Sequence, residues 1–165
     1  MNRFHVLQAR PNYCVPACVV MVERWRGQPC PDSERRQHEI FEAANHFGLC
    51  PLAAVEDFVG RRPTLDVRDP NSVSLLAEFV RSTWAIVVCF PREFGLLARA
   101  RGLDSPHGQL GSTLHAVCIV GASTRRFSVL DPWCYGTDQP ISVTFEQFAA
   151  IWMGDVLLAD ASPSP

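Results

Sequence analysis

The chain has 165 residues and a formal net charge of −2. This length suits one domain, and the near-neutral charge gives no electrostatic basis for binding nucleic acid. The apolar runs are too short to cross a bilayer, and the N-terminal stretch MNRFHVLQARP lacks the apolar core of a signal peptide. We therefore expect a cytoplasmic protein without a membrane span, and export by a specialised route stays open.

The first half of the chain has helical patterns. A helix is predicted from about Tyr13 to Gly27, with Pro16 in its first turn and the glycine at its end. A second helix is predicted within 31–48, capped by Asp32 or Ser33 and ended by Gly48, with apolar residues at helical spacing up to Phe47. Two further short helices are expected within 51–60 and 71–82.

After Thr83 the pattern changes to strands. Segments 84–90, 114–122 and 126–132 are predicted strands, and a turn near residues 123–126 joins the last two. A short helix (144–154) that ends at a glycine and a last strand (155–160) follow. Residues 91–113 form a long connection, and 161–165 are expected to be a disordered tail after one domain of residues 1–160. Helices followed by an antiparallel sheet predict an α+β fold, with a site in the cleft between the halves.

Seven cysteines, an odd number, argue against a disulfide framework and favour reduced, mostly buried thiols. Cys14 differs, because it stands at the start of the first helix. Free backbone N–H groups and the positive end of the helix dipole lower a thiol pKa there, and the thiolate is the nucleophilic form. Cys18, one turn later, is expected in the core.

A thiol nucleophile needs a base. Among five histidines, His5 lies near a chain end that we expect to fray, and His115 opens an apolar strand, LHAVCIV. The next strand ends in LDP, so His115 and Asp131 can meet at the open end of a hairpin. An acid there would orient the imidazole. Taken singly, His115 is better explained as a hydrogen-bonded core residue, and Asp131 as part of a turn before Pro132.

Gln8 lies six positions before Cys14. Its side-chain amide could donate to an oxyanion beside the backbone N–H of Cys14, or it could be an ordinary surface glutamine.

Together, Gln8, Cys14, His115 and Asp131 occur in the order found in papain-like cysteine peptidases. The segments QARPNYCVPACVVMV and LHAVCIVGASTRRFSVLDP most resemble the bacteriocin-processing (double-glycine leader) peptidase family and its standalone relatives. The resemblance covers the first quarter and the last third of the chain. It implies a papain-like fold with Cys14 as nucleophile, His115 as base, Asp131 as orienting acid and Gln8 as oxyanion-hole donor. A peptide or protein substrate and no cofactor are expected.

Two features depart from that family. Val15 follows the nucleophile where the family usually has glycine, and the 91–113 connection is unusually long.

Several hypotheses therefore stay open. The same residues could hydrolyse a peptide or isopeptide bond, deamidate a side chain or transfer an acyl group to an amine. Val15 also leaves room for an inactive binding domain, and a zinc site of Cys14, Cys18 and His115 is a further alternative.

Overall fold

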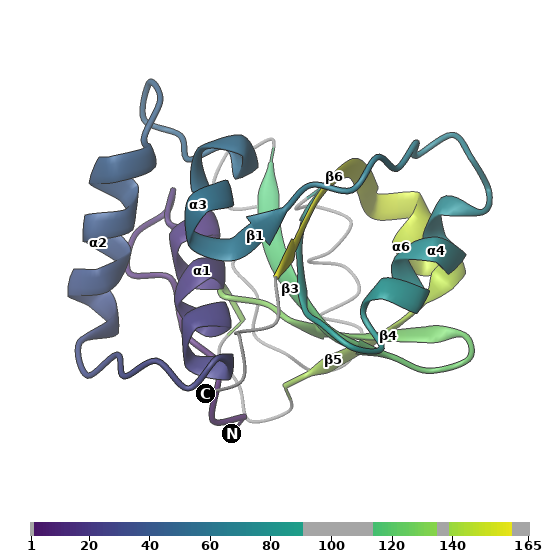
Figure 1. The fold of residues 1–165 in the computed structure, drawn as a ribbon, viewed down its shortest axis with the longest axis horizontal. Coiled ribbons are helices and arrows are strands. Elements are labelled where there is room, and N and C mark those ends of the chain that lie inside the picture. Colours follow the sequence, from purple (N-terminus) through teal and green to yellow (C-terminus); the bar gives the residue numbers. More distant parts are fainter. Residues whose placement is uncertain (1, 91–113, 135–138, 160–165) are drawn as a thin grey trace.

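The computed structural model describes residues 2–90, 114–134 and 139–159. The described strands form one six-stranded sheet in which every neighbouring pair is antiparallel. In spatial order (Figure 1) the strands are β1 (Gly60–Arg61), β6 (Trp152–Ala159), β2 (Ala85–Cys89), β3 (His115–Ala122), β4 (Arg126–Leu130) and β5 (Ile141–Thr144). The predicted α+β architecture is therefore confirmed.

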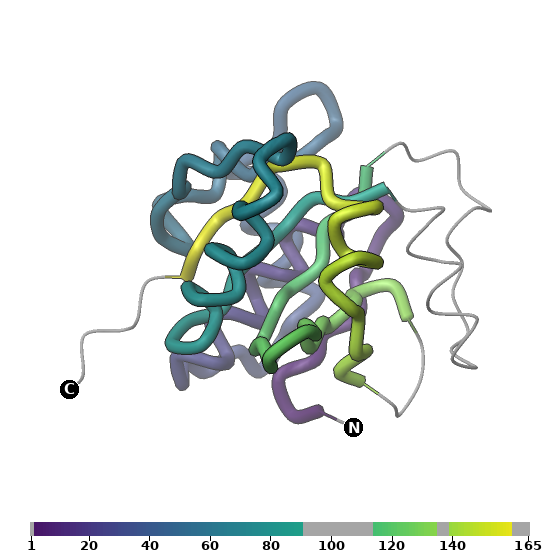
Figure 2. Tube along the Cα trace, turned by 90° about the vertical axis from the view of Figure 1, so that its right-hand side faces the viewer, coloured from purple at the N-terminus to yellow at the C-terminus, as the bar shows by residue number. Residues whose placement is uncertain are grey.

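Helices cover the sheet from both sides. One group consists of α1 (Cys14–Trp25), α2 (Ser33–Ala44), the 3₁₀ turn η1 (Leu52–Val55) and α3 (Glu56–Val59), and the other of α4 (Ser72–Phe79) and α6 (Phe145–Ile151). Figure 1 shows the first group on one side of the sheet, and Figure 2 shows α4 and α6 on the other. Each group packs over its own apolar cluster, so the sheet has a core on each face.

Helix α1 lies at the centre of the first group, between α2 and the sheet. Residues 17–22 of α1 are all fully buried. Burying an apolar side chain of this size contributes roughly 1.5–3 kcal/mol, so this packing fixes the helix firmly against β3. The helix starts at Cys14 and ends where Gly27 takes a positive φ of 77°, as predicted. The position of Cys14 therefore depends on the core rather than on a flexible loop.

Helix α2 is shorter than its sequence predicts. Asp32 caps it by accepting from the Arg35 N–H at 2.9 Å, but the helix ends at Ala44 instead of Gly48. The Asn45 side chain accepts from the Gly48 N–H at 2.9 Å and so closes a turn that competes with another helical turn. Phe47, placed on the apolar face by the sequence pattern, is 93% exposed in this turn.

Other elements differ at their ends. Helix α6 stops at Ile151, and Trp152 opens β6 by pairing with Cys89, so the predicted last strand begins earlier than expected. Strands β1 and β5 were not predicted, because two and four residues carry too little periodicity. The 91–113 connection and the 161–165 tail lie outside the described residues. Within the described ranges, no helix is long and apolar enough to cross a membrane.

Candidate active site

Cys14 is the first residue of α1 and is half-buried. Burial alone raises the pKa of its thiol. The hydrogen bond and charge of His115, together with the backbone N–H groups of Ala116 and Val15, outweigh that effect and lower the pKa below its ordinary value. The thiolate is thus favoured by a charged partner and by backbone donors, the arrangement expected for a reactive cysteine.

His115 is the first residue of β3, where it pairs with Cys89, and it is 1% exposed. Its Nε2 lies 2.8 Å from Oδ1 of Asp131. Burial lowers the pKa of His115, but the charge and hydrogen bond of Asp131, with a further contribution from Cys14, raise it to about 9. Because Nε2 is hydrogen-bonded to Asp131, Nδ1 is the nitrogen of His115 that makes the hydrogen bond with Cys14. The imidazole therefore links the thiol to the carboxylate.

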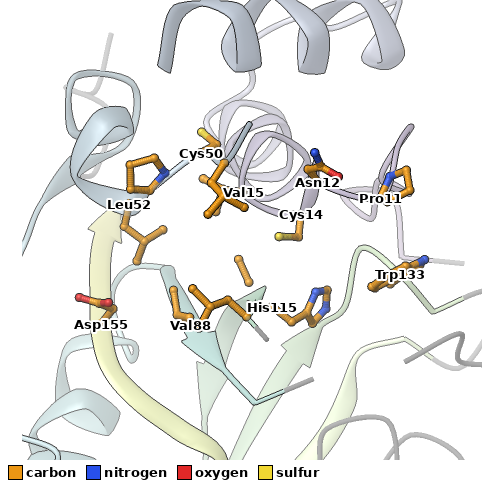
Figure 3. A pocket seen from close by; sticks show the side chains of 14 residues that line it. Pro11, Asn12, Cys14, Val15, Cys50, Leu52, Val88, His115, Trp133 and Asp155 are labelled. Atoms are coloured by element: carbon orange, nitrogen blue, oxygen red, sulfur yellow. The ribbon is translucent and has the colours of Figure 1, made fainter. Parts of the chain in front are cut away.

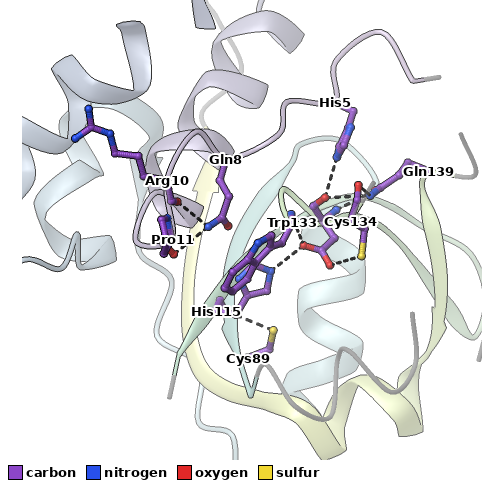
Figure 4. A network of polar contacts seen from close by, with 10 residues as sticks. His5, Gln8, Arg10, Pro11, Cys89, His115, Trp133, Cys134 and Gln139 are labelled. Atoms are coloured by element: carbon purple, nitrogen blue, oxygen red, sulfur yellow. Dashed lines mark hydrogen bonds and ion pairs between the residues drawn. The ribbon is translucent and has the colours of Figure 1, made fainter. Parts of the chain in front are cut away.

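Asp131 follows β4 directly and is fully buried. Its Oδ1 also accepts from the backbone N–H of Trp133 at 2.8 Å, and its Oδ2 accepts from the Cys134 thiol at 2.8 Å. The ring of Trp133 packs beside the imidazole of His115, with centroids 5.8 Å apart (Figure 4). A buried carboxylate needs such donors to remain charged, so this turn holds Asp131 as a partner for a cationic imidazole.

The sequence-based expectation that a hairpin brings His115 and Asp131 together agrees with this geometry. Strands β3 and β4 pair in antiparallel register, with Cys118 opposite Leu130. One residue beyond that leucine, the chain turns and presents Asp131 to the start of β3. The contact thus depends on the length of the two strands and on the one-residue register shift between Ile119 and Gly121.

Gln8 lies beside this assembly, held by a hydrogen bond from its backbone N–H to the Pro132 carbonyl at 2.8 Å. Its Nε2 donates to the carbonyls of Arg10 and Pro11 at 2.8 and 2.9 Å. Its buried Oε1 has no hydrogen-bond partner among the described residues. The amide therefore holds the turn that leads into α1. Donation to an oxyanion requires one of these two N–H bonds to be exchanged.

Cys18 is fully buried, as predicted, and its carbonyl accepts from the Cys118 thiol at 3.5 Å. Burial raises the pKa of the Cys18 thiol well above its ordinary value, and the neighbouring Cys118 raises it further. In the ranges that the structure describes, no group of three or more His, Cys, Asp or Glu residues is arranged to hold a metal ion. The alternative of a zinc site formed by Cys14, Cys18 and His115 thus has no geometric support there.

A cavity of about 480 Å³ opens beside Cys14 and His115. Figure 3 shows the Cys14 sulfur pointing into it, with Val15 on the same wall and Val88 on the opposite one. The described lining is mostly apolar and consists of Pro11, Asn12, Cys14, Val15, Leu49, Cys50, Pro51, Leu52, Val88, Leu114, His115, Ala116, Trp133 and Asp155. The path to the thiol is therefore mostly apolar, and Val15 narrows the space next to the sulfur.

Three residues that sequence reasoning did not assign to the site support Asp131. His5, expected at a frayed end, is buried, and its Nε2–H donates to the Asp131 carbonyl at 2.8 Å. Cys134 donates to the carboxylate, and the Gln139 side chain bonds the Asp131 backbone. No spacing rule marks such residues, because their role depends on where the chain returns in three dimensions. Trp133 lines the cavity, whereas Tyr13 packs on Phe41.

No protein-family model matches the sequence, and no curated protein matches it either. Solved structures do match. The peptidase domain of Streptococcus ComA, a bifunctional ABC transporter involved in quorum sensing, is 14% identical with a TM-score of 0.58, and the match covers 94% of this chain and 96% of that domain. A Bacillus anthracis protein described as a C39-like peptidase is 12% identical with a TM-score of 0.61, covering 97% and 96%. The chain therefore has the papain-like fold of C39 peptidase domains, as its motifs predicted.

Proposed function

We propose that the chain is a thiol hydrolase that cleaves a peptide or isopeptide bond. The observation that carries the proposal is the continuous contact from the Cys14 thiol through His115 to the Asp131 carboxylate, at the wall of an open cavity. The fold shared with peptidase domains supports it. In this proposal Cys14 is the nucleophile, His115 the base and Asp131 the residue that orients the imidazole.

The reaction follows from the charges of these groups. The thiolate of Cys14 attacks the substrate carbonyl carbon, and the carbonyl oxygen becomes an oxyanion. The backbone N–H of Cys14 and, after exchange of one hydrogen bond, the amide of Gln8 stabilise that oxyanion. His115 then gives its Nδ1 proton to the leaving amine, and the C–N bond breaks to leave a thioester on Cys14.

Water completes the cycle. His115, now neutral, takes a proton from a water molecule, and the resulting hydroxide attacks the thioester. The acid product leaves, and the thiolate and imidazolium form again. Throughout both steps Asp131 keeps Nε2 protonated, so that Nδ1 is always the nitrogen that exchanges protons.

The substrate class follows from the cavity. Its apolar lining suits a peptide or protein segment with apolar side chains next to the bond that breaks. The same thioester would react with an amine in acyl transfer, and attack on a glutamine side chain would give deamidation. These outcomes differ in their products, so one experiment separates them.

The test incubates the chain with a defined peptide pool plus a labelled primary amine, and reads the products by mass spectrometry. The proposal predicts new peptide termini that appear with the unmodified chain and disappear with Cys14→Ala. The variant Cys18→Ala is the matched control and should keep the activity, because that thiol lies in the core.

Other products would contradict hydrolysis. Amine incorporation without new termini indicates an acyltransferase, and conversion of glutamine to glutamate indicates a deamidase. Peptides that are retained without conversion by both the chain and Cys14→Ala indicate a binding domain.

A further inference from the structure

Gln139 stands where the sheet would continue beside Asp131. The β4–β5 ladder runs from Arg126↔Thr144 to Val129↔Ile141. Two residues further along each strand, the same register puts Asp131 opposite Gln139. Strand β5 begins only at Ile141, however, and Pro140 has no N–H to give to a ladder. The backbone hydrogen bonds of the β4–β5 ladder therefore do not continue to Asp131 and Gln139.

The side chain of Gln139 supplies the missing pair of hydrogen bonds. Its Oε1 accepts from the Asp131 backbone N–H at 2.9 Å, and its Nε2 donates to the Asp131 carbonyl at 3.0 Å. In an antiparallel hydrogen-bonded pair, the opposite residue makes the same two bonds through its own backbone N–H and C=O. The glutamine amide thus takes the place of a strand residue, and both polar groups of a fully buried backbone are satisfied.

The same amide also ties down the turn after Asp131. Its Nε2 lies 3.4 Å from the carbonyl of Cys134, whose thiol holds Oδ2 of the carboxylate. Gln139 itself is 7% exposed, so water cannot easily replace it. Gln139 thus holds the backbone of Asp131 together with His5, and it also contacts the turn that carries the thiol donor of Asp131 (Figure 4).

We propose that Gln139 is a positioning residue that keeps Asp131 at hydrogen-bond distance from His115. This inference rests on the proposed function, since it concerns the same three groups. A catalytic contact tolerates only about 0.5 Å of displacement before its effect is lost. Without the amide, the buried N–H of Asp131 would lose its bond to Gln139, and the residue would shift to recover a partner in that position. His115 would then lose part of the charge that raises its pKa, and Cys14 would lose part of its thiolate.

The test measures how the alkylation rate of Cys14 by iodoacetamide depends on pH, with the modified site identified by mass spectrometry. Gln139→Met keeps the length of the side chain but removes both hydrogen bonds. Gln139→Asn keeps an amide that is one methylene too short to reach. The matched control is Gln147→Met, because Gln147 also bonds a backbone N–H, that of Thr144 in the α6 capping box, away from the cavity lining. Thermal melts are recorded for all variants.

In both Gln139 variants the midpoint of Cys14 alkylation should rise by roughly one pH unit, the size expected when an opposite charge moves away. Gln147→Met should lower the melting temperature and leave the midpoint where it is. The inference is overturned if the Gln139 variants melt earlier but keep the original midpoint. Failure of both Gln139 variants to fold, while Gln147→Met folds, would also overturn it and make Gln139 a folding residue.

The same alkylation experiment also tests the proposed function separately. If Cys14 of the unmodified chain already shows the alkylation midpoint of an ordinary thiol, the proposed pairing of Cys14 with His115 is wrong. This conclusion does not depend on the Gln139 variants. If the midpoint is low and insensitive to Gln139, only the present inference fails.

Discussion

Helix α1 presents a cysteine to strand β3 at two places, and the two thiols behave in opposite ways. At the start of both elements Cys14 meets His115, and the thiol pKa falls below its ordinary value. One turn along the helix Cys18 meets Cys118, and the thiol pKa rises well above it. Burial raises the pKa at both places. The charged partner and the backbone N–H groups of Val15 and Ala116 therefore decide which thiol has the lowered pKa.

The two places also differ in what surrounds the strand. Around Cys118 the neighbours are apolar core residues, whereas His115 leads directly to a carboxylate held by buried donors. A core contact of the first kind contributes stability. A buried ionic chain of the second kind is costly unless every group is paired, so its presence indicates a function. The following variants test this contrast, from the largest expected effect to the smallest.

Removing each thiol in turn should give the largest difference in turnover between two variants. Cys14→Ala should reduce turnover by about 10⁶-fold, as expected for a nucleophile in a triad that acts as a unit, and leave the melting temperature nearly unchanged. Cys18→Ala should do the reverse, keeping activity while the free energy of unfolding falls by about 1 kcal/mol. Turnover assays and melts of both variants measure this. Activity that survives in Cys14→Ala and disappears in Cys18→Ala would exchange the two roles.

Removing the carboxylate tests the ionic chain itself. Asp131→Ala should lower turnover by roughly 10⁴-fold, because His115 loses both its charge partner and its fixed tautomer. Asp131→Asn should cost less, since its oxygen can stay on His115 while its NH₂ faces the Cys134 sulfur. Single-turnover rates of the two variants, compared with their melts, check this order. Equal and unchanged rates would remove Asp131 from the mechanism.

Gln8→Ala separates transition-state stabilisation from support of the chain. An oxyanion donor acts only during turnover, so turnover should fall by roughly 10²-fold while Cys14 alkylation stays nearly intact. The amide also bonds the carbonyls of Arg10 and Pro11, just before α1. An equal loss of alkylation and turnover would mean that Gln8 only holds this turn.

Cys134 should give the smallest effect. Cys134→Ala removes the donor to Oδ2 of Asp131 and should slow turnover about tenfold, because a hydrogen bond to a charged group is worth about 1.5 kcal/mol. Cys134→Ser keeps a donor and should restore most of the rate. Steady-state assays of the pair decide this, and a serine variant as slow as the alanine variant would assign Cys134 to packing.

Much of this arrangement could be predicted from the sequence, because local rules govern it. Asp32 and Gly27 mark helix ends through capping and positive φ, and Cys14 follows from the predicted helix start. The approach of His115 to Asp131 follows from two adjacent strands joined by a short turn, although the register shift between Ile119 and Gly121 could not be predicted.

The remaining features depend on contacts distant in sequence. Gln139 substitutes for a strand partner only because β5 begins late, and β5 itself is too short to show a pattern. His5 is buried by its contact with the Asp131 carbonyl, which composition near the N-terminus does not reveal. The Asn45 turn ended α2 early, because a side-chain hydrogen bond competed with helical periodicity.

The central claim is that His115 makes Cys14 the reactive thiol, and the pH dependence of Cys14 alkylation tests it most directly. Because the pKa of Cys14 is lowered, its thiolate persists at pH values below the ordinary pKa of a thiol. Because the pKa of His115 is about 9, its imidazolium persists up to about that pH. The alkylation midpoint should therefore lie below about 8.5, the value of a free thiol, and should move up in His115→Ala, where burial is opposed only by the backbone N–H groups of Val15 and Ala116. A midpoint at or above that value, unchanged in His115→Ala, would contradict the account.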